Sequence, residues 1–139
     1  NTGGNDINTK YYEFWRKGIP RENVKLSDVE DVIIKAAFNE DGGLKYSELI
    51  KHHLIDHFVP FLPMERSHVR LCIKDYLMTK NYTFNSNMEE EEKFIAKVSD
   101  SLPYFPKDTG LFSSSGCKRV KQKVDLGLEE LKEKNDDQV

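Results

Sequence analysis

The residues best suited to chemistry lie together in the turn Gly116-Cys117-Lys118. Backbone N–H groups at the start of a helix point outward and favour anions. A lysine in the first turn adds a mobile positive charge, so this turn could hold a phosphate oxygen. A cysteine in the same positive field favours its thiolate form and is sensitive to oxidation. The alternative is an ordinary helix start beside a buried cysteine, and spacing by itself favours that alternative.

The chain contains two cysteines, Cys72 and Cys117. They could be two buried thiols, or they could form one disulfide that closes a long loop and stabilises the fold by about 4 kcal/mol on the chain-entropy model. The triplet Asn81-Tyr82-Thr83 is a glycosylation sequon, which has physical meaning only in a secretory compartment. The sequon by itself is a weak signal, but together with the cysteine pair it favours an oxidising lumen.

Other arrangements that would support catalysis or metal binding are missing from the sequence. There is no Gly-x-x-x-x-Gly-Lys-Ser/Thr loop and no apolar strand that ends in an acidic pair, so nothing cradles phosphates or positions magnesium. No Ser-His-Asp or Cys-His set has a convincing context. The four histidines are His52, His53, His57 and His68. No cysteine or acidic ligand is spaced to complete a zinc site, so we interpret them as surface side chains.

The composition is that of a folded chain with mixed charges. It has 139 residues, of which 37% are hydrophobic, and a formal net charge of -3, which fits one domain or parts of two. The sequence lacks the basic stripe that would predict binding to nucleic acid. No apolar run approaches the roughly 20 residues of a membrane-spanning helix. The opening residues 1–5 include neither an initiator Met nor a signal-peptide pattern, so we expect the sequence to begin inside a longer protein.

Helical periodicity predicts a mainly α fold with short strands (α+β). The expected helices run from Asn5 or Asp6 to Lys17, from Ser27 in a capping box with Glu30, from Ser47 to Leu54, from about Met64 to Lys80, from Met88 to about Leu102, and from the N-cap candidates Ser113-Ser114-Ser115 onward. Gly18 is the expected stop of the first helix. Extended segments are expected at 58–63, 82–84 and 102–106. We place a domain boundary at the first of these, which contains Pro60 and Pro63.

Apolar positions that repeat with the helical period predict the buried faces. These are Ile7, Tyr11, Phe14 and Trp15 in the first helix, Val29, Val32, Ile33 and Ala36 in the second, Val69, Leu71, Cys72, Tyr76 and Leu77 in the helix from Met64, Phe94, Ile95 and Val98 in the next, and Val120, Val124, Leu128 and Leu131 in the last.

Two longer stretches resemble the torsins, which are AAA+ ATPases of the endoplasmic reticulum lumen and the nuclear envelope. One is LIDHFVPFLP at 54–63, followed by HVRLC at 68–72, and the other is YFPK at 104–107 with LFSSSGCK at 111–118. The opening NTGG resembles the torsin-2 type, and other stretches resemble other members. The resemblance covers residues 1 to about 125. It implies the end of an AAA+ large domain at 1–60, a small lid domain at 64–132 and a frayed charged tail at 133–139.

The resemblance also implies roles for single residues. Asn1 matches the sensor-1 asparagine, which lies near the γ-phosphate in the family, and Lys118, preceded by Gly116 and Cys117, matches the sensor-2 lysine. Cys72 and Cys117 match a cysteine pair that can form a disulfide in torsins and would couple redox state to nucleotide sensing. ATP and magnesium would bind the full-length ATPase, whereas this segment by itself would bind neither and would be inactive.

The implied function is ATP-driven, chaperone-like remodelling of proteins in the lumen of the endoplasmic reticulum and the perinuclear space. The implied partners are membrane-anchored activators of the lamina-associated polypeptide 1 type, which supply an arginine finger, and further copies of the chain. Ser99-Asp100-Ser101 departs from the pair of glutamates that some torsins carry, which puts an activator contact in doubt. Two other hypotheses stay open: a stand-alone interaction module, and a redox-switched regulatory domain without nucleotide chemistry.

Overall fold

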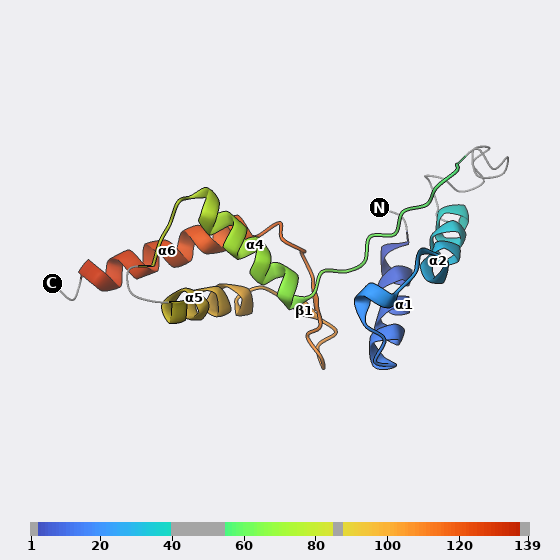
Figure 1. Ribbon diagram of the computed structural model, residues 1–139, viewed down its shortest axis with the longest axis horizontal. Coiled ribbons are helices and arrows are strands. Elements are labelled where there is room, and N and C mark those ends of the chain that lie inside the picture. Colours follow the sequence, from blue (N-terminus) through green and yellow to red (C-terminus); the bar gives the residue numbers. More distant parts are fainter. Residues whose placement is uncertain (1–2, 40–54, 85–87, 137–139) are drawn as a thin grey trace. The chain divides into compact units, whose positions relative to one another are not determined.

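A computed structural model describes residues 3–39, 55–84 and 88–136. The chain divides into two compact units, Asn1–Pro63 and Met64–Val139, which Figure 1 colours from blue to green and from green to red, respectively. The fold class is the expected one, because the described elements are helices and one small sheet. The helix expected at 47–54 and the sensor-1-like Asn1 lie outside the described residues. Among the described helices, none has the length and apolar character needed to cross a membrane.

The first unit consists of α1 (Gly4–Arg16) packed against α2 (Leu26–Asn39), with the short 3-10 helix η1 (Arg21–Asn23) between them in sequence. The prediction that Gly18 ends α1 is confirmed. Gly18 has a φ of 71°, its N–H donates to the Trp15 carbonyl, and the Ile19 N–H donates to the Phe14 carbonyl. These bonds satisfy carbonyls at the end of the helix in the way that a left-handed glycine allows.

The buried faces of this unit differ from the prediction in part. Ile7 and Tyr11 are buried as expected, but Trp15 is 39% exposed, and its ring stacks on that of Tyr12. In α2 the buried residues are Val29, Ile33 and Ala37, which follow one another at intervals of four. The prediction that Ser27 caps α2 is wrong, because the helix already begins at Leu26. At this end the Asp28 carboxylate accepts a hydrogen bond from the Lys25 N–H at 2.8 Å.

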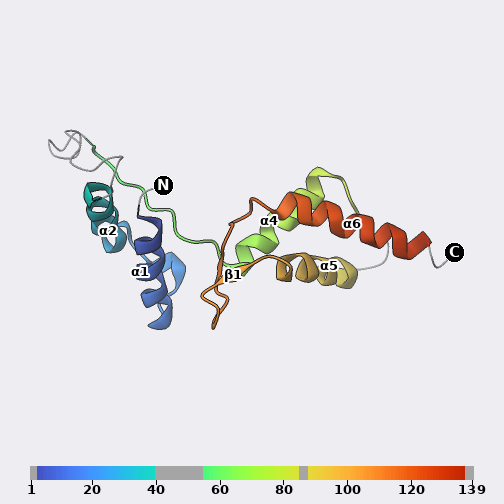
Figure 2. The same cartoon turned by 180° about the vertical axis from the view of Figure 1, so that it is seen from behind.

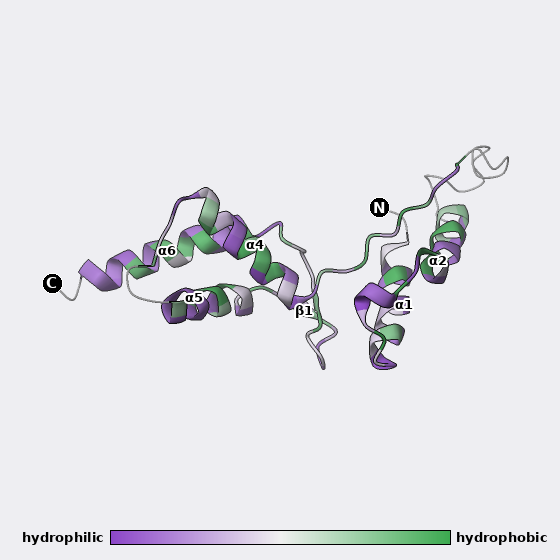
Figure 3. Cartoon of the chain, in the orientation of Figure 1, coloured by the Kyte–Doolittle hydropathy of each residue, from purple (hydrophilic) through white to green (hydrophobic). Residues whose placement is uncertain are grey.

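The second unit is a bundle of α4 (Arg66–Thr79), α5 (Met88–Asp100) and α6 (Val120–Asp136). Each helix contacts the other two, and they gather together in both views of the molecule (Figures 1 and 2). Figure 3 shows hydrophobic and hydrophilic residues alternating along them, as expected for helices with one buried face. The core that they enclose is Val69, Ile73, Leu77, Phe94, Ile95, Val98, Leu102, Val120, Val124 and Leu128.

The start and the buried face of α4 differ from the prediction. The helix begins at Arg66 rather than Met64, because Glu65 is its N-cap and the Glu65 N–H donates to Nδ1 of His68 at 2.9 Å. Leu71 was expected on the buried side but is 63% exposed. The nearest buried residues of α4 lie two positions before and two positions after Leu71, which places Leu71 on nearly the opposite side of the helix.

A short antiparallel hairpin precedes α6. It pairs β1 (Tyr104–Phe105) with β2 (Phe112–Ser113), so that Tyr104 faces Ser113 and Phe105 faces Phe112. The prediction that Ser113-Ser114-Ser115 caps the last helix is wrong. Ser113 belongs to β2, and α6 begins only at Val120, after a turn. Ser113 is held in the strand because its N–H donates to the Met64 carbonyl at 2.7 Å, a contact across the fold that no local pattern reports.

Candidate functional site

The turn Gly116-Cys117-Lys118 lies between β2 and α6. Gly116 has a φ of 56°, which a residue with a side chain rarely adopts. The Ser113 hydroxyl donates to the Gly116 carbonyl at 2.9 Å, and the Lys118 N–H donates to the Ser115 carbonyl at 3.2 Å. These bonds fix the path of the backbone from the hairpin into the helix.

A disulfide joins this turn to α4. Cys117 is bonded to Cys72, with a Cα–Cα distance of 6.3 Å and a sequence separation of 45. Of the two interpretations of the cysteines, the disulfide is therefore confirmed. In this oxidised form the sulfur of Cys117 has no proton to lose, so the expected thiolate chemistry belongs only to a reduced form. The bond fixes the middle residue of the turn to a helix of the core.

Met64 is part of this site, although its position in the sequence does not predict a role there. Its Sδ lies 3.7 Å from Sγ of Cys117, and it would lie only 3.3 Å from a Cβ placed on Gly116. Its neighbour Glu65 forms a bridge with Phe112 of β2. Met64 is also the first residue of the second unit. The sequence carries no signal for this contact, because more than fifty positions separate Met64 from the turn.

Positive charge collects at the start of α6. Lys118 and Arg119 are exposed, and the first turn of the helix contains no acidic residue. The partial positive charge of a helix N-terminus is thus reinforced rather than neutralised by the nearby side chains. Such an arrangement suits a phosphate group chemically, since two cationic side chains just before the helix add to the positive field of its N-terminus.

The segment Ser99-Asp100-Ser101 has a structural role in this chain. The hydroxyl of Tyr104 donates to the carbonyl of Ser99 at 2.9 Å, and Ser99 is completely buried. Asp100 pairs with Arg66 at 2.5 Å, and the Arg66 guanidinium lies 3.9 Å from the centre of the Tyr104 ring. These contacts hold the end of α5 against the start of α4 and against β1, which is the first strand of the hairpin that leads into the turn.

Ion pairs connect the three helices away from the turn. The carboxyl of Glu92 has a lowered pKa, first because Lys74 donates a hydrogen bond to it and then because Arg70 lies beside it. The pKa of Asp125 is lowered chiefly by a hydrogen bond from Lys80, and that of Glu130 chiefly by one from Lys97. Every one of these carboxyls pairs with a base from another segment, so we interpret the pairs as links between elements rather than as catalytic groups.

The other candidate sites are less suited to chemistry. Within 3–39, 55–84 and 88–136, no three His, Cys, Asp or Glu side chains gather in a way that could hold a metal. His52 and His53 lie outside these ranges, and His68 accepts the Glu65 N–H. The glycosylation candidate Asn81 is exposed after the end of α4, so the structure does not bring it to the turn.

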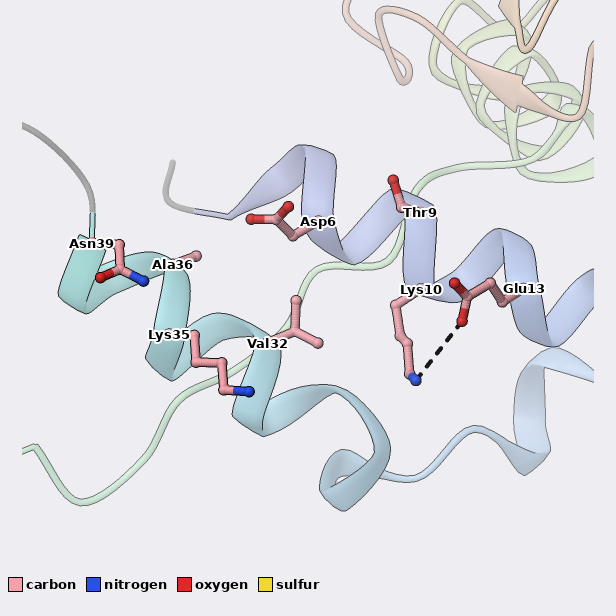
Figure 4. Close-up of a pocket in the computed structure, with 8 residues that line it drawn as sticks. All are labelled: Asp6, Thr9, Lys10, Glu13, Val32, Lys35, Ala36 and Asn39. Atoms are coloured by element: carbon pink, nitrogen blue, oxygen red, sulfur yellow. Dashed lines mark ion pairs between the residues drawn. The ribbon is translucent and has the colours of Figure 1, made fainter.

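The first unit has a groove of about 440 Å³ between α1 and α2, shown in Figure 4. Its lining residues are Asp6, Thr9, Lys10, Glu13, Val32, Lys35, Ala36 and Asn39. Lys10 pairs with Glu13 at 3.8 Å. Two carboxylates and two ammonium groups leave the lining without a net charge, so it favours no class of charged ligand. The turn before α6 therefore remains the best candidate site.

Comparison with known proteins places the candidate site inside a recognised domain. A family-wide sequence profile described as "Torsin-1A, C-terminal domain" matches residues 64–126. A "Torsin-like protein" of Caenorhabditis elegans is 43% identical over 132 residues, which are 95% of this chain and 36% of that protein. A "Torsin-like protein" of Drosophila melanogaster is 36% identical over 128 residues, covering 92% of this chain and 37% of that protein. The chain thus spans little more than a third of the length of these relatives.

Proposed function

We propose, from the premise that this chain belongs to the torsin family, that it forms the lid and nucleotide-sensing part of a torsin-like AAA+ ATPase. The observation that carries the proposal is the exposed Lys118 two residues before α6, in a turn that a disulfide holds to α4. In the whole ATPase this part would respond to ATP that is bound mainly by other segments. ATP hydrolysis would then remodel proteins in the lumen of the endoplasmic reticulum and the nuclear envelope.

Each residue of the turn would have a separate role in sensing nucleotide. The Lys118 ammonium and the backbone amides of α6 that follow Val120 would hold a phosphate oxygen, since the Val120 N–H already donates to the Cys117 carbonyl. Gly116 would let the backbone turn tightly beneath them, since its φ is positive. ATP with magnesium supplies the phosphate chain and the energy of its cleavage. The sequence contains no phosphate-cradling Gly-x-x-x-x-Gly-Lys-Ser/Thr loop, so we expect no hydrolysis by the segment by itself.

The disulfide gives the proposal a redox component. Breaking the bond between Cys72 and Cys117 would release the turn from α4, and Lys118, the next residue, would lose its fixed position. We therefore propose that oxidation and reduction of this pair adjust the response to nucleotide. The partners in this function would be membrane-anchored activators of the lamina-associated polypeptide 1 type and further copies of the chain.

The test of the sensor role uses the full-length protein with the change Lys118→Ala. We expect weaker ATP binding or a reduced activation by the membrane-anchored partner, because one charge-assisted hydrogen bond contributes roughly 1.5–3 kcal/mol, or about tenfold to a hundredfold in affinity. Calorimetric titration with ATP and a steady-state hydrolysis assay measure the two effects. Repeating the titration after reduction of the disulfide tests the redox component.

The matched control is Lys132→Ala, an exposed lysine far along α6. Both variants remove one positive charge, so a general electrostatic effect would appear equally in both. Equal ATP affinity and activation in the Lys118→Ala variant and the unaltered protein would refute the sensor role. That result would favour the rival hypothesis, an interaction module that kept the fold without nucleotide chemistry.

A further inference from the structure

The sequon Asn81-Tyr82-Thr83 has no role in nucleotide sensing, and the structure gives it a definite setting. Asn81 immediately follows the C-cap of α4, Lys80, and has a φ of 51°. Asparagine is one of the few residues other than glycine that adopts this left-handed conformation at the end of a helix. Its N–H donates to the Met78 carbonyl at 3.0 Å. The backbone of Asn81 thus ends the helix, and its side chain is exposed.

The segment after Asn81 alternates between core and solvent. Tyr82 and Phe84 are partly buried, whereas Asn81 and Thr83 are exposed. The Tyr82 and Phe84 rings meet edge to face at 4.9 Å, and the Phe84 ring lies 5.3 Å from that of Phe94 on α5. Successive side chains of an extended segment point to opposite sides. The two aromatic residues therefore anchor the segment to the core while the two residues that define a sequon face outward.

We propose that Asn81 carries an asparagine-linked glycan. In this reaction the side-chain amide nitrogen of Asn81 forms a bond to the anomeric carbon of an oligosaccharide carried on a lipid pyrophosphate. The bond between that carbon and the pyrophosphate oxygen breaks, the lipid pyrophosphate leaves with the bonding electrons, and the amide gives up one proton. The Thr83 hydroxyl completes the recognised triplet. No redox step is involved.

Two further observations agree with this proposal. The disulfide between Cys72 and Cys117 is the kind of bond that persists in secretory compartments, where glycan transfer takes place. The folded chain also has room for the sugar, because the acceptor side chain lies outside the core. The inference rests on the luminal location proposed above, but it does not depend on the sensing of ATP.

A glycan at this position would leave the candidate sensor free. Cys72 and Asn81 are nine positions apart, which corresponds to about 13 Å along a helix axis. The sugar would instead cover the end of the bundle, near the groove lined by Lys80, Tyr82, Asp125, Leu128, Glu129 and Lys132. We infer that this end of the second unit faces solvent in the assembled protein, and that activators or neighbouring subunits dock elsewhere.

The test uses full-length protein recovered from the lumen of microsomes of eukaryotic cells. Peptide-N-glycosidase treatment in ¹⁸O-water converts a glycosylated asparagine to ¹⁸O-labelled aspartate, which mass spectrometry locates. We expect the label at Asn81, its loss in Thr83→Ala and its retention in Thr83→Ser. Because Asn81→Gln would strain the left-handed position, the Thr83 variants are the decisive pair, since they leave that backbone unchanged.

The outcome that would overturn the inference is an unmodified Asn81 peptide in luminal protein whose Cys72–Cys117 disulfide is intact. A label that persists in Thr83→Ala would also overturn it, because that label would not depend on the sequon. Neither result would affect the proposal that Lys118 senses nucleotide, because the ATP titration of the Lys118→Ala variant tests that proposal separately.

Discussion

At position 127, a close contact with another helix, rather than an unusual backbone conformation, requires glycine. Gly127 lies in the interior of α6 and is buried. A Cβ added there would lie 2.9 Å and 3.1 Å from two ring atoms of Phe94 on α5. Phe94 is itself only 5% exposed, so its ring has little room to move away. Glycine at this position allows α5 and α6 to pack closely.

The change Gly127→Ala is therefore expected to destabilise the second unit, although alanine is the better helix former by about 1 kcal/mol. Overpacking of a core costs about 1–3 kcal/mol, so the crowding against Phe94 outweighs the gain. Denaturant unfolding of the two proteins measures the difference. Gly4→Ala is the control, because a Cβ on Gly4 meets nothing within 4 Å. An unfolding midpoint of Gly127→Ala at or above that of the unaltered chain would contradict this packing argument.

Single residues of the candidate site could be recognised from sequence only by type. Cys72 and Cys117 stood out as a pair, but spacing does not give a Cα–Cα distance, so their disulfide stayed one of two alternatives until the resemblance to torsins favoured it. Met64 and Gly127 could not be recognised, since both act through contacts with distant segments. Lys118 is exposed, but it lies in the turn two residues before α6 begins and not in the first helical turn that its sequence context predicted.

At the scale of elements, the helices could be predicted better than their ends. The 3.6-residue period of apolar side chains is a local signal, and α1, α4 and α5 lie within about two residues of their predicted ends. The start of α6 was placed too early because Ser113 belongs to β2 and a turn separates that strand from the helix. That boundary is set by the pairing of β2 with β1 and with Glu65, which is a tertiary contact.

Acid should loosen the contacts between helices. Glu92, Asp125 and Glu130 all have a lowered pKa because bases donate hydrogen bonds to them in the fold. A lowered pKa means a contribution to stability that is complete above the ordinary value, 4.5 for a glutamate, and is lost as pH falls through the folded value. We expect the melting temperature of the second unit to fall below about pH 4.5 and to be nearly constant from there to neutrality.

The variant Glu92→Gln identifies one source of this acid dependence. It removes the charge that Arg70 and Lys74 share, so its melting temperature should vary less with pH in the acid range. Glu133→Gln, at an exposed position on α6, should keep the full dependence. Identical acid curves for the Glu92 variant and the unaltered chain would show that this carboxyl does not link α4 to α5 energetically.

At the scale of the whole molecule, the chain consists of two units that are stabilised in different ways. The second unit has a core of ten buried apolar residues and a disulfide. In the first unit the described buried residues are Ile7, Tyr11, Val29, Ile33 and Ala37, and the disulfide does not reach it. The disulfide closes a loop of 45 residues that contains α5 and the hairpin. Its effect on stability should therefore stay within the second unit.

The double change Cys72→Ser and Cys117→Ser tests this division. Loss of a 45-residue loop closure is expected to lower the unfolding free energy of the second unit by about 4 kcal/mol on the chain-entropy model. Hydrogen exchange measured by mass spectrometry should show faster exchange in α4, α5 and α6 and unchanged exchange in α1 and α2. Adding a reductant to the unaltered chain should reproduce the pattern, and the double variant should not respond to it. Equal loss of protection in α1 and α2 would mean that the two units unfold as one, and reduction of the disulfide could then not be treated as a change confined to the second unit.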